Sequence, residues 1–267
     1  MNYMSKSVLI TGVSGGMGLA TAKKLISLGY QVYGLDIKEP TEQLEGLSFI
    51  KADLTKLEEV ESAFNKVNEE LDAIINTAGI YDLNSLIEIS EEEFIRIFNI
   101  NVFSIYRVNK TFLPRLKEKG RIIMVSSELA PLDPLPFTGL YAITKSTIEK
   151  YAYSLRMELQ LLGYKVILIR PGAVDTGLIE VSTTKLDQFT SNTTHYQYNA
   201  QKFKQIVDSV ESKKVSPDKI ANVIYKAMTK KRPKYVYKIN RNKGLLILNM
   251  LPKWWQHRII KKILQKK

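Results

Sequence analysis

Short apolar runs recur along this chain, and segments of helix length separate them. The runs lie near residues 7–10, 31–36, 47–51, 72–76, 121–126, 164–170 and 234–237. Alternation of buried strands with helices is typical of an α/β domain whose parallel sheet carries helices on both faces. The 267 residues are enough for one such domain with a fully buried core. We therefore predict a doubly wound parallel sheet that binds ligands at the carboxyl ends of its strands.

A strand, a glycine-rich turn and a helix follow one another over residues 7–26, and the turn reads Thr-Gly-Val-Ser-Gly-Gly-Met-Gly. Gly12 permits a tight turn, while Gly16 and Gly18 let backbone and helix approach a pyrophosphate closely. Backbone N–H groups at the start of the helix then face the anion along the helix dipole. We predict a dinucleotide phosphate site here. A glycine-rich loop without a ligand is the alternative.

The second apolar run ends in a carboxylate, Asp36, about 20 residues beyond the glycines. A carboxylate at this place accepts hydrogen bonds from the adenosine ribose of NAD and repels the 2′-phosphate of NADP. The glycine loop holds no Arg or Lys, and the nearest cation is Lys38, two residues past Asp36. We predict NAD as the preferred cofactor, and Lys38 leaves NADP open. A carboxylate that only ends the strand is the structural alternative.

Tyr141 and Lys145 lie four residues apart in a segment of helical periodicity. Residues at this spacing share one face of a helix. An ammonium beside a phenol stabilises the phenolate, so we expect Lys145 to lower the pKa of Tyr141 toward the range of an acid/base catalyst. The spacing alone is weak, because a solvated pair on a helix surface has the same pattern.

Six motifs occur in a fixed order along the chain. They resemble those of the short-chain dehydrogenase/reductase superfamily over roughly residues 5–240, and their joint occurrence is far more specific than any one of them. The resemblance implies a single-domain Rossmann fold with a seven-stranded parallel sheet. It also implies hydride transfer between a nicotinamide cofactor and a carbonyl or alcohol. The motifs are Thr11-Gly12-(x)3-Gly16-x-Gly18, Asn76-Thr77-Ala78-Gly79, Asn101, Ser126-Ser127, Tyr141-(x)3-Lys145 and Pro171-Gly172.

The resemblance assigns catalytic roles to four residues. Tyr141 would donate the proton in reduction and accept it in oxidation, and Lys145 would lower its pKa and bind the nicotinamide ribose. Ser127 would hold the substrate oxygen, and Asn101 would anchor a water that leads from Lys145 to solvent. The loop between Ser127 and Tyr141 contains three prolines and is slightly longer than is usual in the family. Ser126 therefore stays open as the catalytic hydroxyl, although we favour Ser127.

The resemblance also assigns cofactor contacts. Asp53 with Leu54 would contact the adenine, and residues 76–79 would lie beside the adenosine ribose. Val174 and Thr176 would hold the carboxamide. Asp53 and Thr176 can equally be helix N-caps. The predicted cofactor-binding set is Gly12, Ser14, Gly16, Met17, Gly18, Asp36, Asp53, Leu54, Asn76, Ala78, Gly79, Tyr141, Lys145, Pro171, Val174 and Thr176.

Composition argues against several other classes of protein. The chain has no cysteine and only two histidines, His195 and His257, so we predict no metal site and no Ser-His-Asp triad. The net charge of +12 is uneven, because residues 212–267 hold 17 Lys and Arg side chains and one acid, Asp218. The remainder is mildly acidic. We therefore predict no nucleic-acid partner, but a basic appendage.

We place the dinucleotide-binding and catalytic domain at residues 1–243, with a substrate lid at about 177–211 that is rich in polar residues. An apolar pocket would suit a small hydrophobic alcohol or carbonyl compound. His195 is expected to be a lid or surface residue. The predicted pocket residues are Leu129, Leu135, Phe137, Leu178 and Ile179.

Residues 244–267 form a predicted basic, amphipathic C-terminal extension in which Pro252 separates two short helices. We favour packing of the second helix on its own domain or on a partner subunit. Peripheral contact with an anionic membrane stays open, since Trp255 begins a basic amphipathic helix. No signal peptide and no membrane-spanning run is predicted, so we expect a cytoplasmic protein.

These observations favour an NAD-preferring oxidoreductase that interconverts a hydrophobic alcohol and its ketone or aldehyde, with Tyr141 as acid/base. An NADPH-dependent carbonyl reductase is one alternative. A non-catalytic dinucleotide-binding scaffold on the same fold is another, and the proton-transfer residues weigh against it. The resemblance further implies a homo-dimer or tetramer, formed through the helices that carry Asn101 and Tyr141.

Overall fold

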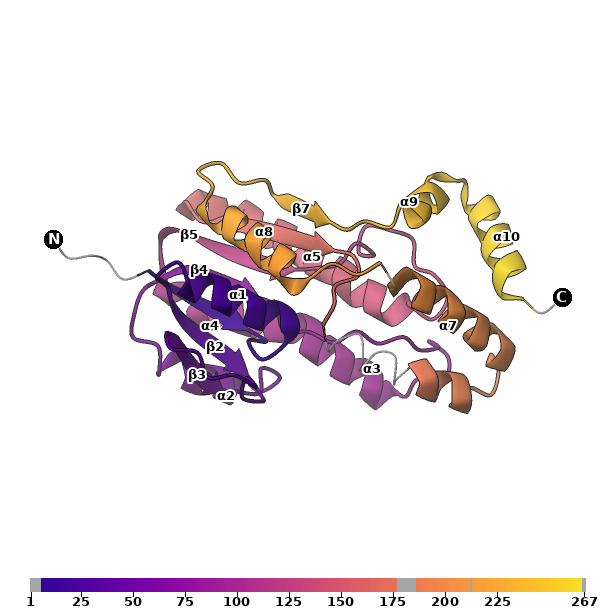
Figure 1. The fold of residues 1–267 in the computed structure, drawn as a ribbon, viewed down its shortest axis with the longest axis horizontal. Helices are drawn as coiled ribbons and strands as arrows, with labels where there is room; N and C mark the ends of the chain where they lie inside the picture. The colour runs from indigo at the N-terminus through magenta and orange to yellow at the C-terminus, as the bar shows by residue number, and fades with distance from the viewer. Residues whose placement is uncertain (1–5, 177–185, 212, 266–267) are drawn as a thin grey trace.

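The computed structural model describes residues 6–176, 186–211 and 213–265. They form a parallel sheet between two layers of helices (Figure 1). The seven strands of this sheet pair in parallel in the order β3-β2-β1-β4-β5-β6-β7, which confirms the predicted fold class. The strands are β1 (Ser7–Thr11), β2 (Gln31–Asp36), β3 (Leu47–Lys51), β4 (Leu71–Asn76), β5 (Leu116–Val125), β6 (Lys165–Pro171) and β7 (Val236–Ile239).

The start of β5 was predicted five residues too late. Leu116 pairs with Leu71, and the next pair joins Arg121 to Ala73, so the register shifts between them. Lys119 lies in this irregular stretch with a φ of 63°. The charged residues of the stretch hide the strand from a search for apolar runs.

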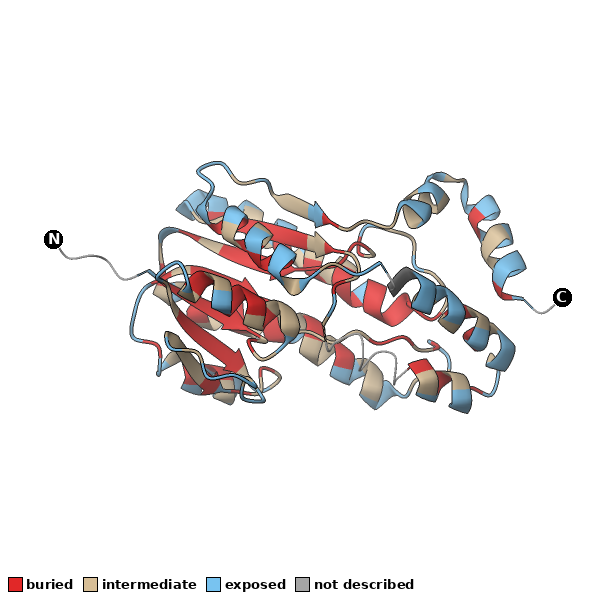
Figure 2. Ribbon diagram, in the orientation of Figure 1, coloured by how far each residue is buried: buried red, intermediate tan, exposed pale blue. Residues whose placement is uncertain are grey.

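Alternate residues of the strands supply two apolar layers. Val8 and Ile10 of β1 pack with α1 and α8 on one face of the sheet, while Leu9 packs with α2, α4 and α5 on the other. The buried residues accordingly lie along the sheet and the inner faces of these helices (Figure 2). The helices are α1 (Gly16–Ile26), α2 (Leu57–Phe64), α3 (Glu91–Phe98), η1 (Asn99–Phe103, a π-helical turn), α4 (Ser104–Phe112), η2 (Leu113–Arg115), α5 (Gly139–Leu159), η3 (Gln160–Leu162), α7 (Gln197–Glu211), α8 (Pro217–Thr229), α9 (Lys243–Met250) and α10 (Lys253–Leu264).

The predicted C-terminal extension forms α9 and α10, with Pro252 between them. Both helices lie at the end of the molecule opposite the N-terminus (Figure 1). Leu264 of α10 belongs to the same apolar cluster as Phe203 of α7, and the Asn199 side chain donates a hydrogen bond of 2.8 Å to the Leu264 carbonyl. The favoured prediction was a helix packed on its own domain or on a partner subunit, and these contacts place α10 against α7 of its own chain.

The first part of the predicted lid, residues 177–185, lies outside the described residues. Residues 186–192 are helical, and Phe189 is buried in the apolar cluster with Phe203. Glu88 holds the following polar stretch, because its carboxylate accepts hydrogen bonds from the Thr193 hydroxyl (2.7 Å) and the backbone N–H of exposed His195 (2.9 Å). The described part of the lid is thus a packed unit.

In the described ranges, no helix combines the length and the apolar character needed to cross a membrane. The same residues contain no group of three or more His, Cys, Asp or Glu side chains that could hold a metal ion.

Candidate active site

The glycine-rich turn between β1 and α1 leaves room for an anion. Gly12 has a φ of +68°, and a Cβ there would lie 2.7 Å from the Ala78 Cα. A Cβ on Gly18 would lie 2.8 Å from the Gly12 carbonyl carbon and 2.9 Å from Thr77 Oγ1. Gly15 caps α1 without a side-chain hydrogen bond, and the first turn has no acid. Its N–H groups therefore fit a dinucleotide phosphate.

A cavity of about 490 Å³ adjoins this turn and reaches the ends of β2 and β3. Asp36 lines it, and its carboxylate accepts hydrogen bonds from the backbone N–H of Ser14 (3.0 Å) and Lys38 (3.2 Å). Ser14 itself does not line the cavity, and its backbone N–H is the group that donates to Asp36. The structure thereby gives Asp36 a second role, which is to hold the glycine turn in place. The predicted contacts that line this cavity are Gly12, Gly16, Met17, Gly18, Asp36, Asp53, Leu54, Ala78, Gly79 and Thr176.

Asp53 also stabilises a turn. Its carboxylate accepts hydrogen bonds from the backbone N–H (2.9 Å) and hydroxyl (2.7 Å) of Thr55. The N-cap of α2 is Lys56, so Asp53 caps this turn and not the helix. Thr176 is the last described residue before 186, and whether it caps a helix lies outside the described residues.

Asn76 does not line the cavity beside the glycine-rich turn. It is 1% exposed, and its side-chain amide donates a hydrogen bond of 2.8 Å to Asn109 Oδ1 of α4. Its neighbours Thr77 and Gly79 do line the cavities. The structure therefore gives Asn76 a buried structural contact between β4 and α4.

A second cavity, of about 170 Å³, is lined by Ser127, Tyr141 and Lys145. The Ser127 side chain lies near enough to the Tyr141 phenol to favour its ionised form, which partly offsets the rise in the pKa of Tyr141 that burial causes. Lys145 Nζ lies 5.6 Å from the centroid of the Tyr141 ring and donates a hydrogen bond of 3.3 Å to the Val125 carbonyl. α5 supplies both Tyr141 and Lys145 from one face, and the end of β5 places Ser127 opposite them.

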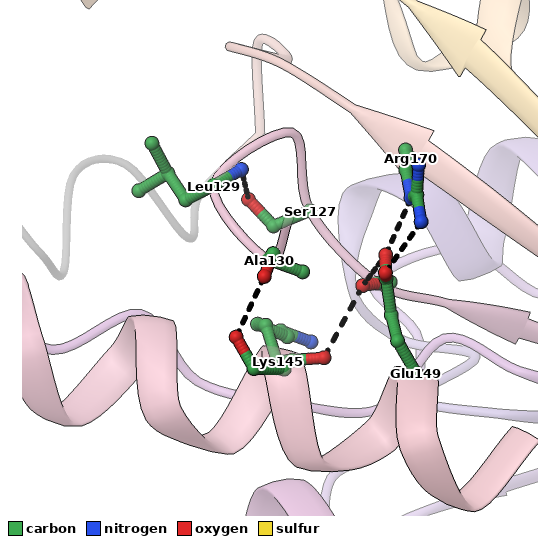
Figure 3. Close-up of polar contacts among 8 residues, drawn as sticks. Ser127, Leu129, Ala130, Lys145, Glu149 and Arg170 are labelled. Atoms are coloured by element: carbon green, nitrogen blue, oxygen red, sulfur yellow. Dashed lines mark hydrogen bonds and ion pairs between the residues drawn. The ribbon is translucent and has the colours of Figure 1, made fainter. Parts of the chain in front are cut away.

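The hydrogen-bond partners of Ser126 and Ser127 distinguish the two candidates for the substrate-binding serine. Ser126 Oγ donates a hydrogen bond of 2.9 Å to Glu149, which forms a bidentate ion pair with Arg170. Ser127 Oγ accepts a hydrogen bond from the Leu129 N–H at 3.2 Å, on the opposite side from this ion pair (Figure 3). Ser127 therefore has its hydroxyl beside the phenol, which supports it as the substrate-binding serine.

Asn101 lies in the π-helical turn between α3 and α4, and single π-turns of this kind often mark functional sites. It is fully buried, and its side chain exchanges hydrogen bonds with the backbone of Ile80 and donates one of 3.1 Å to Thr144. A Cβ on Gly79 would lie 3.2 Å from Asn101 Oδ1 and 3.4 Å from Lys145 Nζ. The absence of a side chain at Gly79 thus leaves room for Lys145 and Asn101 close to each other. The water that Asn101 would anchor between Lys145 and solvent stays a prediction.

The pKa expected for Tyr141 differs from what the structure shows. Burial raises the pKa of Tyr141 to about 12, and the charge of Glu128 adds to this effect. Burial lowers the pKa of Lys145 to about 8. The expected direction was therefore wrong for the chain without a cofactor, because desolvation of the phenolate outweighs the nearby ammonium.

The wall of the second cavity is largely apolar, and it contains two of the five residues that were predicted to line the substrate pocket. Leu129 and Leu135 line it. Phe137 lies behind them in the apolar cluster, 5.4 Å from the Phe203 ring, while Leu178 and Ile179 lie outside the described residues. Sequence reasoning missed the other wall residues, although the amphipathic period of residues 197–211 was a usable signal for α7. The missed residues include Ile80, Tyr81, Glu128, Thr138, Phe203, Ile206, Val207 and Leu245.

A parallel sheet with a glycine turn at its switch point and a Ser–Tyr–Lys group beside it defines a class, the dinucleotide-binding α/β proteins. A sequence model described as short chain dehydrogenase matches residues 6–187. The chain belongs to this family.

Estradiol 17-beta-dehydrogenase 2 of Mus musculus is 36% identical over 190 residues, which are 65% of this chain and 49% of that protein. The match thus spans about half of the mouse protein. A 3-ketodihydrosphingosine reductase of Bacteroides thetaiotaomicron is 28% identical over 237 residues, 87% of each chain. A short chain dehydrogenase/reductase of Burkholderia phymatum, solved in complex with NAD, superposes with a TM-score of 0.73 at 20% identity, covering 88% of this chain and 90% of that one.

Proposed function

We propose that this chain is an NAD-preferring oxidoreductase that interconverts a hydrophobic alcohol and its ketone or aldehyde. The observation that carries the proposal is that Ser127, Tyr141 and Lys145 line one apolar cavity, which adjoins the dinucleotide cavity. The two cavities adjoin each other, because five residues line both. These are Met17, Thr77, Gly79, Ile80 and Thr176.

A bound nicotinamide dinucleotide would supply or accept the hydride. Tyr141 donates its phenolic proton to the carbonyl oxygen in reduction and takes it back in oxidation. Ser127 donates a hydrogen bond to the same oxygen as its negative charge develops. Lys145 stabilises the phenolate that remains on Tyr141. The apolar walls exclude water around these groups, which strengthens each interaction.

The cofactor preference rests on Asp36, whose carboxylate lies at the rim of the dinucleotide cavity. Arg96 also lines this cavity, but its guanidinium is held by Glu93 through two hydrogen bonds of 2.5 Å. It is therefore not poised to bind a 2′-phosphate. NADP remains the alternative cofactor for a carbonyl reductase on this fold.

Asp36→Asn is expected to shift the ratio of kcat/KM for NADPH over NADH by about tenfold toward NADPH. The amide oxygen still accepts the Ser14 N–H, so the glycine turn is kept while the repelling charge is lost. Initial rates with both cofactors measure the effect. Asp53→Asn is the matched control, because Asp53 lines the same cavity but holds Thr55. Wild-type protein that prefers NADPH would refute the reading of Asp36.

Substrate class follows from the cavity walls and from the relatives. The walls are mostly apolar, and two relatives are named for estradiol and for 3-ketodihydrosphingosine. A panel of hydrophobic alcohols and ketones, monitored at the NADH absorbance, tests the proposed reaction. Dinucleotide binding without turnover of any member of the panel would favour the non-catalytic scaffold.

We also propose that the chain forms a homo-oligomer through the outer faces of α4 and α5. Both helices expose large apolar side chains on the surface, including Tyr106 (45%) and Tyr153 (55%). Exposed patches of this kind often mark subunit interfaces. Light scattering during gel filtration measures the mass, and a monomer at micromolar concentration would contradict the proposal.

The outer side of α9 and α10 fits an anionic membrane surface, and we propose that it makes a peripheral contact there. Met250 is 84% exposed, and the stacked pair Trp254 and Trp255 is 53% and 47% exposed. Arg258 lies over the Trp254 ring at 5.3 Å, and Lys253, Lys261 and Lys262 belong to the same helix. Exposed Trp side chains among cations are typical of helices that lie in a lipid interface.

Replacing Trp254 and Trp255 together by Ala is expected to lower partitioning onto phosphatidylglycerol vesicles about tenfold. Co-sedimentation of the full chain, with phosphatidylcholine vesicles for comparison, measures this. Leu161→Ala with Leu162→Ala is the matched control, because these exposed apolar residues follow α5 and lie outside the tail. Equal binding of all three proteins would argue against the contact, and loss of a dimer in the Trp variant would point to a second copy instead.

A further inference from the structure

Glu128 is a buried carboxylate in the wall of the substrate cavity. It follows Ser127 in the loop after β5 and is 7% exposed. It lines the cavity together with Ser127 and Tyr141. Consecutive Cα atoms lie about 3.8 Å apart. Glu128 therefore lies beside the serine that would hold the substrate oxygen. The proposed reaction assigns it no part.

Within the described ranges, one of its two oxygens accepts a hydrogen bond from the protein. Oε2 accepts a hydrogen bond of 2.6 Å from the backbone N–H of Asn242. Oε1 lies against Gly172, where a Cβ would be 2.8 Å from it. Among the described residues none donates to Oε1, and Arg241 acts on the carboxylate through its charge without forming an ion pair.

Oε1 is open to the cavity, since it is not one of the fully buried side-chain atoms that lack a partner among the described residues. Burial raises the pKa of Glu128, while the Asn242 N–H and the Arg241 charge favour the ionised form. Buried charges in proteins are normally paired or fully hydrogen-bonded. An ionised carboxylate is an acceptor only, so a group in the cavity that meets Oε1 must be a donor. The cavity is where that donor can enter.

We propose that Oε1 of Glu128 accepts a hydrogen bond from the substrate, and that the substrate is a hydrophobic ketone or alcohol with an ammonium group near the reacting carbon. An ammonium matches the negative charge and forms the stronger, charge-assisted bond, whereas a hydroxyl would form a weaker one. The substrate class rests on the proposed oxidoreductase function. The binding of an ammonium by Glu128 does not.

A purely structural role is the competing explanation. Glu128 ties Asn242 to the cavity, and Asn242 caps α9, which carries the wall residue Leu245. In that case Glu128→Gln would weaken every ligand alike. Glu88→Gln is the matched control, because Glu88 also accepts backbone N–H groups from a distant segment but lies outside the cavity.

Titration calorimetry of the full chain at pH 7 with octylamine and with octanol tests the inference without turnover. We expect octylamine to bind about ten- to a hundredfold more tightly than octanol, and Glu128→Gln to remove most of this preference. Glu88→Gln should keep it, and Glu128→Asp should keep part of it. No preference in the wild-type protein, or an unchanged preference in Glu128→Gln, would overturn the inference.

Turnover separates the two proposals. If ketones without an amine are reduced and octylamine shows no preference, the oxidoreductase stands and the role of Glu128 falls. If octylamine is preferred through Glu128 but no alcohol or ketone reacts, the ammonium site stands and the proposed reaction falls. For amino ketones, the gain should appear in KM more than in kcat. The comparison of two ligands on the wild-type chain needs no variant, so a Glu128→Gln protein that fails to fold leaves the test intact.

Discussion

Tyr141→Phe is expected to lower kcat for ketone reduction by about 10²- to 10⁴-fold. The substitution removes only the phenolic oxygen, which is the proton donor in the proposed reaction and lines the same cavity as Ser127. NADH binding, followed by protein fluorescence, should change little. The melting temperature should not fall, because the ring and its packing remain.

Tyr81→Phe is the matched control for this result. The Tyr81 ring packs edge-to-face against Tyr141 with centroids 4.6 Å apart, and it lines the same cavity. Removing its hydroxyl should leave kcat within about threefold, because Tyr81 has no place in the proton transfer. Turnover that survives in Tyr141→Phe would remove the phenol from the mechanism.

The same residue predicts how the two directions depend on pH. Burial raises the pKa of Tyr141 to about 12, so the phenol is the dominant form throughout the neutral and mildly alkaline range. Reduction uses the phenol and should show no alkaline loss from this group up to about pH 10. Oxidation needs the phenolate, so its rate should rise with pH over the same range. Tyr141→Phe should lose that rise.

Gly18→Ala is expected to abolish measurable dinucleotide binding and to lower the free energy of unfolding by about 1–3 kcal/mol. An added Cβ would overlap the carbonyl oxygen of Gly12 and lie 2.9 Å from Thr77 Oγ1. Neither neighbour is the end of a flexible side chain, so the turn must move away from α1. Urea unfolding and an NADH titration measure the two effects.

Gly15→Ala lies in the same turn and serves as the control. Gly15 has φ −79° and ψ 155°, which any residue adopts, and a Cβ there would lie 3.3 Å from the Gly12 oxygen. We expect a change in stability of less than about 1 kcal/mol and only a modest loss of affinity. Equal losses in both variants would mean that the close approach of α1 to the turn is not what Gly18 provides.

Much of the fold was predictable because its signals are local. Apolar runs separated by helix-length segments specify buried strands and their order along the chain. β5 is the exception, because residues 117–119 are charged and this part of the strand joins the sheet through the pairing of Leu116 with Leu71. The C-terminal helix boundary at Pro252 was equally local, because proline cannot continue a helix.

The candidate site likewise has features that the sequence predicts and features that depend on tertiary contacts. Tyr141 and Lys145 lie on one face because of their spacing, but the direction of the pKa shift of Tyr141 depends on its burial. The resemblance already favoured Ser127 over Ser126, and the structural reason is Glu149, which lies 23 residues after Ser126 and accepts a hydrogen bond from its hydroxyl.

The sequence by itself determined the alternation of strands and helices, the glycine turn, and the Tyr–Lys spacing on one helix face, because periodicity and backbone freedom act between near neighbours. Only the tertiary structure decided that Glu128 meets Asn242, 114 residues away, and that α7 and α9 close the substrate cavity. Such contacts depend on which distant surfaces pack together, and desolvation then sets the charge state of every group they bury.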